Sequence, residues 1–266
     1  MRHFLMKIME VSYNNRPVHF EISGAGKAVV LLHGFLENSQ IWEPAAVVLA
    51  KNFLCIKIDL FGHGKTPQQG EQHKMSEMAK AVNAVLEKLN ITEAAFLGHS
   101  MGGYVALAFA ELFPEKVHRL LLLNSTAYAD SEARKKVRER AMRLVKQNKE
   151  AFVSMAIKNL FSEVNKNKFS QQIEAMVLEA KKLSTEAVVA TLSGLKDRKN
   201  RVGVLADFAK KTYLLGGEED PLVLRSSQEQ LAEETGVPLV LFEGGHMSYL
   251  EAQEAFLAEV QFILDK

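Results

Sequence analysis

Short apolar runs and helical stretches alternate along the first half of the chain. The runs at 27–34, 53–59, 94–100 and 117–125 are apolar at most positions, and a segment with helical spacing separates each run from the next. A strand buried on both faces has this continuous apolar pattern, whereas a half-exposed strand alternates between apolar and polar residues. The pattern therefore predicts βα units and a largely parallel sheet.

The two ends of the chain extend this sheet. Residues 6–13 and 16–22 alternate between apolar and polar positions around "NNRP", which predicts an opening β-hairpin. Near the C-terminus the alternation of strand and helix returns, with a strand at 210–217, a helix from about Leu222, a strand at 237–245 and a final helix from Ser248.

Residues 127–205 interrupt the alternation. They contain helical patterns and no convincing strand, and they carry 17 Lys and Arg against 9 Asp and Glu, a net charge of +8, while the rest of the chain has a net charge of −7. No internal repeat is present. We therefore expect one α/β core formed by residues 1–126 and 206–266, into which residues 127–205 are inserted as a helical unit.

Composition narrows the class of protein. The chain has 266 residues, of which 47% are hydrophobic and 24% charged, and its net charge of +1 offers no argument for binding nucleic acid. The only cysteine, Cys55, lies in an apolar run and is expected in the core. The N-terminus is too short and too charged for a signal peptide, and no apolar run has the roughly 20 residues of a membrane span. We expect a cytoplasmic protein; nothing in the sequence indicates its oligomeric state.

The stretch "GHSMGG", residues 98–103, matches G-x-S-x-G where a predicted strand passes into a predicted helix. A serine in so tight a turn takes strained backbone angles, and glycines two residues to either side avoid Cβ clashes. The hydroxyl of Ser100 is then exposed at the carboxyl edge of the sheet, beside a helix N-terminus that favours negative charge. The alternative is a glycine-rich turn in which the serine has no chemical role.

A serine hydroxyl needs a base beside it before it can attack a carbonyl at neutral pH. Among the eight histidines, His246 follows a predicted strand and lies on a loop at the carboxyl edge. His63 lies on another such loop and is the strongest rival. His99 adjoins Ser100 in the turn and is expected to point elsewhere, and His33 precedes the loop that should supply a backbone donor.

An imidazole base in turn needs an acceptor for its second nitrogen, which fixes the tautomer and stabilises the cation. Asp220 ends "GGEED" on the loop after the preceding strand, at the same edge of the sheet. The alternative is that Asp220 and its neighbours Glu218 and Glu219 are only solvent-exposed charges on a loop. An aspartate before a proline also suits a turn. The order Ser100, Asp220, His246 is the nucleophile, acid and base order of one hydrolase scaffold.

These motifs make the chain similar to enzymes of the α/β-hydrolase fold over essentially its whole length. "LLHGF" resembles the family's oxyanion loop, "IDLFGHGKT" its glycine-rich loop, "GHSMGG" its nucleophile elbow, and "GGEEDP" and "GGHM" its acid and histidine loops. The resemblance implies a mostly parallel central sheet flanked by helices, with residues 127–205 as a helical cap. In part of the family the acid follows the strand here at 117–125, where this chain has Asn124 and, further on, Asp130.

The resemblance also implies roles for individual residues. The implied catalytic residues are Ser100, Asp220 and His246. The implied oxyanion hole consists of the backbone N–H groups of Phe35 and Met101, which agrees with the need for one donor directly after the nucleophile and another after "LLHG". Apart from the resemblance, the residues considered for an apolar acyl pocket or substrate contact are Phe35, Leu36, Met101, Tyr128, Phe152, Phe161 and Met247. Aromatic and methionine residues at helical spacing more often belong to the core, which is the alternative for Phe152 and Phe161 in particular.

The serine at the elbow limits the chemistry. Dehalogenases and epoxide hydrolases of this fold have an aspartate there, so we expect hydrolysis of a small-molecule ester through an acyl-enzyme, without a metal or organic cofactor. No H-E-x-x-H zinc motif occurs. The alternatives are a thioesterase, a carbon–carbon bond hydrolase or lyase acting on a carboxylate-bearing substrate, or a slow-turnover ligand receptor. A catalytically inactive scaffold is disfavoured because all three triad positions are filled.

The positive charge of residues 127–205 bears on which substrates could bind. The arginines of this segment would favour a carboxylate or phosphate group if they faced the site; the candidates are Arg134, Arg138, Arg143, Arg198 and Arg201. The simpler interpretation is that they lie on the solvated faces of amphipathic helices, as exposed Lys and Arg usually do.

Overall fold

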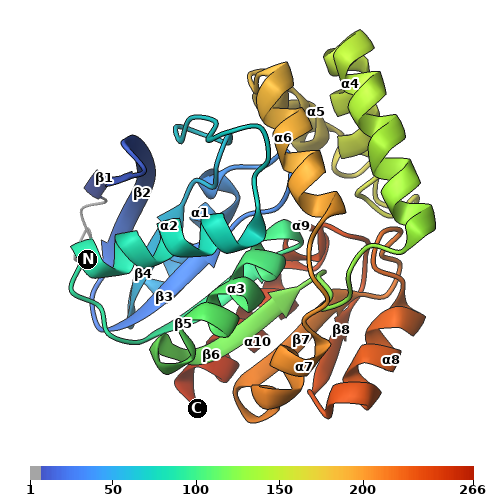
Figure 1. The fold of residues 1–266 in the computed structure, drawn as a ribbon. Helices are drawn as coiled ribbons and strands as arrows, with labels where there is room; N and C mark the ends of the chain where they lie inside the picture. The colour runs from blue at the N-terminus through green and yellow to red at the C-terminus, as the bar shows by residue number, and fades with distance from the viewer. Residues whose placement is uncertain (1–6) are drawn as a thin grey trace.

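The computed structural model describes residues 7–266, which form an eight-stranded sheet with helices on both faces (Figure 1). The strands are β1 (Lys7–Tyr13), β2 (Arg16–Gly24), β3 (Lys27–Leu32), β4 (Phe53–Ile58), β5 (Ala94–His99), β6 (Val117–Leu123), β7 (Thr212–Gly217) and β8 (Leu239–Phe242). Their order across the sheet is β1-β2-β4-β3-β5-β6-β7-β8. β1 pairs antiparallel with β2, and β2 with β4, while each later neighbouring pair is parallel. The predicted hairpin and mostly parallel sheet are confirmed.

The α-helices fill the predicted positions between the strands. They are α1 (Glu43–Leu49), α2 (Met75–Lys88), α3 (Met101–Leu112), α4 (Glu132–Lys158), α5 (Ser170–Lys181), α6 (Thr185–Lys196), α7 (Val202–Asp207), α8 (Arg225–Thr235), α9 (Ser248–Glu251) and α10 (Gln253–Asp265). Within residues 7–266, no helix combines the length and apolar character that crossing a membrane requires.

Two hydrophobic cores lie on opposite faces of the sheet. One packs against α2, α3, α7 and α8, and the other against α1 and α10. Neighbouring residues of β5 face opposite cores: Phe96 belongs to the first and Leu97 to the second, because successive side chains of a strand alternate. This two-sided burial is the reason that the central strands have no polar alternation. Cys55 on β4 is fully buried in the second core, as expected.

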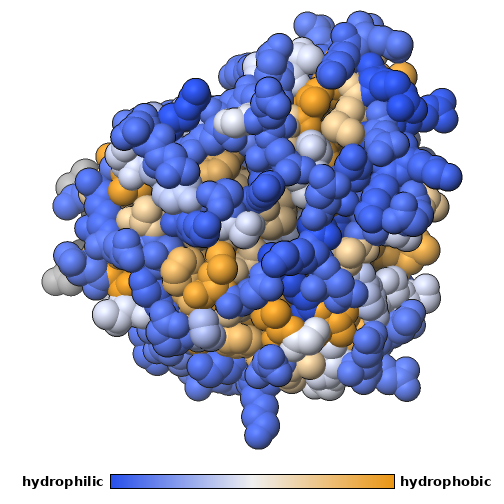
Figure 2. Space-filling view, in the orientation of Figure 1, coloured by the Kyte–Doolittle hydropathy of each residue, from blue (hydrophilic) through white to orange (hydrophobic). Residues whose placement is uncertain are grey.

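Helices α4 to α6 stand together beyond one edge of the sheet, between β6 and β7 in sequence (Figure 1). α4 packs against both α5 and α6, and it is interrupted by non-helical backbone angles at Asn148. α7 packs against α3 and α8 of the core instead. On the face in Figure 2, hydrophilic side chains dominate over α4, and apolar side chains show between α4 and α6.

The boundaries differ from expectation at two places near the C-terminus. α8 begins at Arg225, not at Leu222, because the Asp220 carboxylate accepts the amides of Leu222 and Val223 and holds them in a turn. The helix from Ser248 is divided into α9 and α10. Part of the predicted strand at 6–13, and much of the segment considered as a signal peptide, fall on residues 1–6, outside the described residues.

Candidate active site

Ser100 occupies a strained turn between β5 and α3. Its φ of 50° and ψ of −111° are unusual for a residue with a side chain. The turn is possible because a Cβ is absent at two points: at Gly102 it would lie 2.2 Å from the carbonyl O of Leu32, and at Gly98 it would lie 2.5 Å from the backbone of Gly102. The amide of Ser100 donates to the carbonyl O of Leu123, 2.9 Å away. The glycine pattern in the sequence therefore reflects close backbone packing.

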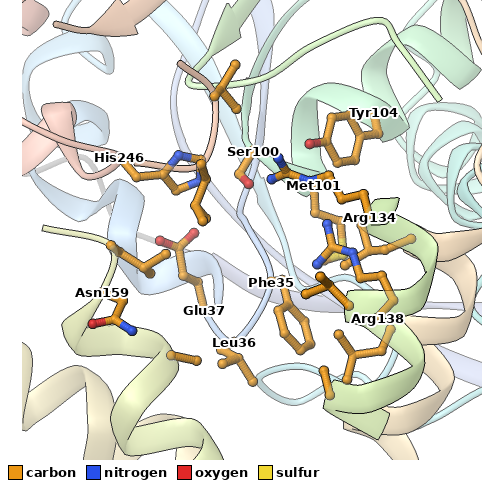
Figure 3. A pocket seen from close by; sticks show the side chains of 18 of the residues that line it. Phe35, Leu36, Glu37, Ser100, Met101, Tyr104, Arg134, Arg138, Asn159 and His246 are labelled. Atoms are coloured by element: carbon orange, nitrogen blue, oxygen red, sulfur yellow. The ribbon is translucent and has the colours of Figure 1, made fainter. Parts of the chain in front are cut away.

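This turn opens into a cavity between the sheet edge and the inserted helices (Figure 3). Ser100, Met101 and His246 line it from the sheet side, together with Phe35 and Leu36 from the loop after β3. Most of the remaining lining is apolar and comes from α4, α6 and the loop after β7; its members include Ala141, Phe152, Ala156, Leu192, Leu195, Leu222 and Val223.

His246 and Asp220 meet at the base of this cavity. The Nδ1 atom of His246 lies 2.8 Å from Oδ2 of Asp220, and both side chains are buried. The other Asp220 oxygen accepts the amides of Leu222 and Val223. Burial alone would raise the pKa of Asp220, but the adjacent His246 and these hydrogen bonds lower it below its ordinary value. Asp220 is thus an anion aimed at the imidazole, as the third group of a catalytic triad must be.

Asn124 supports this carboxylate, a role that the sequence did not indicate. Its side-chain amide donates to Oδ2 of Asp220 at 2.9 Å and to the carbonyl O of Gly245 at 3.2 Å, while its own oxygen accepts from the hydroxyl of Ser248. Asn124 thereby joins the acid loop to the histidine loop. Its φ of 46° lies in the left-handed region, which asparagine tolerates better than most residues.

Glu37 and His99 form a second buried pair beside His246. Oε2 of Glu37 lies 2.8 Å from Nδ1 of His99, and Nε2 of His99 lies 2.9 Å from the carbonyl O of His246. A carboxylate and a carbonyl both accept, so both ring nitrogens donate and His99 is an imidazolium. Burial would lower the pKa of His99 and raise that of Glu37, but each charge stabilises the other and reverses both shifts.

The remaining histidines near this edge support the loops. Nε2 of His63 accepts from the amide of Leu36 at 3.3 Å, and Nε2 of His33 accepts from the amide of Leu60 at 2.9 Å. Burial lowers the pKa of His63 to about 3, with a contribution from His33 nearby. A neutral ring that already accepts a backbone amide and lies outside the cavity lining is not placed to act as a base, so His63 no longer rivals His246.

The predicted oxyanion donors both border the cavity. Met101 is the first residue of α3, so its N–H is among those that find no partner inside the helix. On the other side, Phe35 lies between Gly34, whose amide donates to Glu37, and Leu36, which has a φ of 66°. The unusual φ of Leu36 reorients the chain at this loop.

The predicted substrate contacts divide into two groups. Leu36 and Phe152 line the cavity. Tyr128, Met247 and Phe161 do not: the Tyr128 hydroxyl donates to Glu234, and the other two side chains are buried in the core. These three expectations are corrected. The sequence places each residue near the site, but tertiary packing decides whether its side chain points into the cavity or away from it.

The segment between α4 and α5 also holds the histidine loop directly. The amide of His246 donates to the carbonyl O of Leu160 at 2.8 Å. Glu251 accepts from the amide of Gly245 with one oxygen, and from the amide of Ser162 and the side chain of Asn165 with the other. The position of His246 therefore depends on the insertion as well as on β8. Among residues 7–266, no group of three side chains suited to holding a metal ion was found.

Residues 27–253 match the family described as the alpha/beta hydrolase fold. Among solved structures, a thermophilic esterase from Thermogutta terrifontis, with malate bound, superposes with a TM-score of 0.91 at 24% identity, covering 97% of this chain and 98% of that one.

Two curated relatives differ in how much of this chain they match. The (E)-2-((N-methylformamido)methylene)succinate hydrolase of Acinetobacter baylyi is 23% identical over 252 residues, which is 94% of each chain. An uncharacterised protein of Mycobacterium tuberculosis is 37% identical over 106 residues, 40% of this chain and only 31% of that protein.

Proposed function

The chain belongs to the α/β-hydrolase fold family, and on that premise we propose that it is a serine hydrolase that cleaves small-molecule esters through an acyl-enzyme. The observation that carries the proposal is the buried His246–Asp220 pair in the same cavity to which the strained turn exposes Ser100. Hydrolases among the similar proteins are consistent with it. We also propose that residues 127–205 serve as the cap over this cavity.

In the proposed reaction, Oγ of Ser100 attacks the carbonyl carbon of the ester while its proton passes to Nε2 of His246. Asp220 accepts from the Nδ1–H and stabilises the imidazolium. The proton then passes to the leaving alkoxide, which departs as the alcohol. A water molecule, deprotonated by His246, attacks the acyl-enzyme, releases the carboxylic acid and restores Ser100.

The negative charge that develops on the carbonyl oxygen requires donors that are already in place. We propose the N–H groups of Phe35 and Met101 for this role, because both residues line the cavity, the first in the loop after β3 and the second directly after Ser100 at the start of α3. The N-terminus of α3 adds a favourable dipole. Loss of one such donor typically lowers kcat by about 10²- to 10³-fold.

The test is hydrolysis of p-nitrophenyl esters of increasing acyl length by the unaltered protein and by Ser100→Ala. We expect turnover to fall by about 10³-fold or more in the variant. Ser154→Ala is the matched control, because that serine lies on α4, outside the cavity lining, and donates to the backbone carbonyl of Glu150. Equal turnover by Ser100→Ala would remove the proposed nucleophile, and turnover of thioesters alone would identify a thioesterase instead.

A further inference from the structure

At the start of α4, beside the cavity, three arginines share a single carboxylate. Three guanidinium groups surround Asp130, whose side chain is fully buried: nitrogens of Arg198, Arg138 and Arg134 lie 2.6, 3.1 and 3.7 Å from its oxygens. One carboxylate cannot balance three arginines. The group of four side chains therefore has a net charge of +2.

The three arginines differ in how many contacts they make within the protein. Arg198 donates to the carbonyl O atoms of Tyr128 and Leu195, and it lies 4.4 Å from the ring centre of Tyr104, so it holds the fold together. Arg138 uses only Nε for Asp130, and Arg134 makes only the long contact; within residues 7–266 their remaining nitrogens have no assigned partner. These two, at 19% and 42% side-chain exposure, line the cavity.

The cavity brings two kinds of polar group into a mostly apolar lining. Ser100 and His246 face it from the sheet side, and the side chains of Arg134 and Arg138 extend into it from α4 (Figure 3). The two arginines are four residues apart and so lie on one face of the helix. Alkyl and aromatic side chains make up most of the remaining lining.

We propose that Arg134 and Arg138 bind a second, non-reacting carboxylate of the substrate, so that the preferred substrates are monoesters of dicarboxylic acids. The planar fork of a guanidinium matches a carboxylate with two parallel hydrogen bonds. A doubly charged phosphate is less suitable, because removing it from water into a largely apolar cavity costs more. The inference rests on the proposed function, which places the reacting carbonyl at Ser100, but the anion site itself can be measured without turnover.

The experiment is calorimetric binding to Ser100→Ala of monomethyl esters of dicarboxylic acids with four to eight carbons. Each is compared with the methyl ester of the monocarboxylic acid of the same length, which differs only in the terminal group. We expect the anionic ester of the best-fitting length to bind at least about tenfold more tightly, as charge-assisted hydrogen bonds typically provide. Equal affinity within every pair, or no binding of any anionic ester at millimolar concentration, would overturn the inference.

Variants then locate the site. In the Ser100→Ala background, Arg134→Gln and Arg138→Gln should each remove most of the preference for the anionic ester, and Arg134→Lys should retain part of it. Arg143→Gln is the matched control, because Arg143 lies exposed on the same helix and does not line the cavity. An equal loss with Arg143→Gln would indicate a diffuse effect of the basic insertion and would exclude a specific site.

The two proposals fail in different ways. Arg134 is partly exposed and makes one weak ion pair, so Arg134→Gln remains informative even if Arg138→Gln disturbs folding around Asp130. Binding of the anionic esters without hydrolysis by the intact protein would leave the carboxylate site standing and refute the esterase. Hydrolysis of neutral and anionic esters with equal kcat/KM would support the esterase and refute the carboxylate site.

Discussion

Glu37 and His99 are 62 residues apart in the chain, yet their side chains form a buried ion pair 2.8 Å long. Glu37 also accepts the amide of Gly34, in the loop after β3, and the hydroxyl of Tyr249. His99 donates to the carbonyl O of His246. The pair thus connects the loop that carries one proposed oxyanion donor with the loop that carries the proposed base.

Replacing the carboxylate tests this connection. Glu37→Gln leaves His99 without a counter-charge and should lower the free energy of unfolding by about 3–5 kcal/mol, the usual effect of breaking a buried pair. If the pair positions the two loops, kcat should fall more than KM changes. Urea unfolding and steady-state kinetics measure both, and Glu10→Gln on the exposed side of β1 should change stability by less than about 0.5 kcal/mol. An unchanged kcat in folded Glu37→Gln would limit the pair to a structural role.

Asn124→Asp tests the support of Asp220. The substitution keeps the shape of the side chain but places a second carboxylate against Asp220, where the asparagine amide now donates at 2.9 Å. Two adjacent carboxylates raise the pKa of one of them, so at lower pH a shared proton restores a donor. We expect kcat/KM of the variant, relative to the unaltered protein, to be lowest at high pH and to recover on acidification. A ratio that is constant from pH 5 to pH 9 would contradict this.

His73 connects the core to α6 and should make stability depend on pH. Its amide donates to the carbonyl O of Ala190, and its Nδ1 lies 2.9 Å from the hydroxyl O of Thr191. Burial lowers the pKa of His73 from 6.5 to about 4. Between these values the unfolded chain binds a proton that the folded chain does not, so this contribution to stability is complete above pH 6.5 and decreases as the pH falls towards 4.

The measurement is urea unfolding of the unaltered protein and of His73→Gln at pH 7, 6 and 5. The unaltered protein should lose stability more steeply on acidification, by up to about 1.4 kcal/mol per pH unit for this one residue. Parallel pH dependences would show that His73 takes up its proton without cost in the folded protein.

Two glycines provide opposite predictions for the same substitution. A Cβ at Gly102 would lie 2.2 Å from the carbonyl O of Leu32, so Gly102→Ala must separate α3 from β3, with an expected loss of about 1–3 kcal/mol and reduced activity. Gly203 lies inside α7, and a Cβ there meets nothing within 4 Å, so Gly203→Ala should stabilise by about 0.5–1 kcal/mol. Thermal unfolding of both variants checks the contrast, and a stable, active Gly102→Ala protein would contradict it.

Much of the fold could be predicted from the sequence because its signals are local. The apolar runs of β3 to β6 identify strands buried on both faces, and the turn at Ser100 is recognisable from two glycines that lie within two residues of it. The meeting of His246 with Asp220 also follows from local information, since both lie on loops at the carboxyl ends of neighbouring parallel strands. Their catalytic roles and those of Phe35 and Met101 stay predictions.

Only the tertiary structure decided how side chains from distant segments combine. The sequence alone determined that a serine stands at a strand-to-helix turn and that a basic helical segment follows. It did not determine that Glu37 meets His99, that Tyr128 turns away to Glu234, or that Arg134 and Arg138 face the cavity while Arg143 faces solvent. Local pattern specifies which residues share one face of an element, but which face is buried depends on how whole helices pack, and that is settled by contacts between segments far apart in the chain.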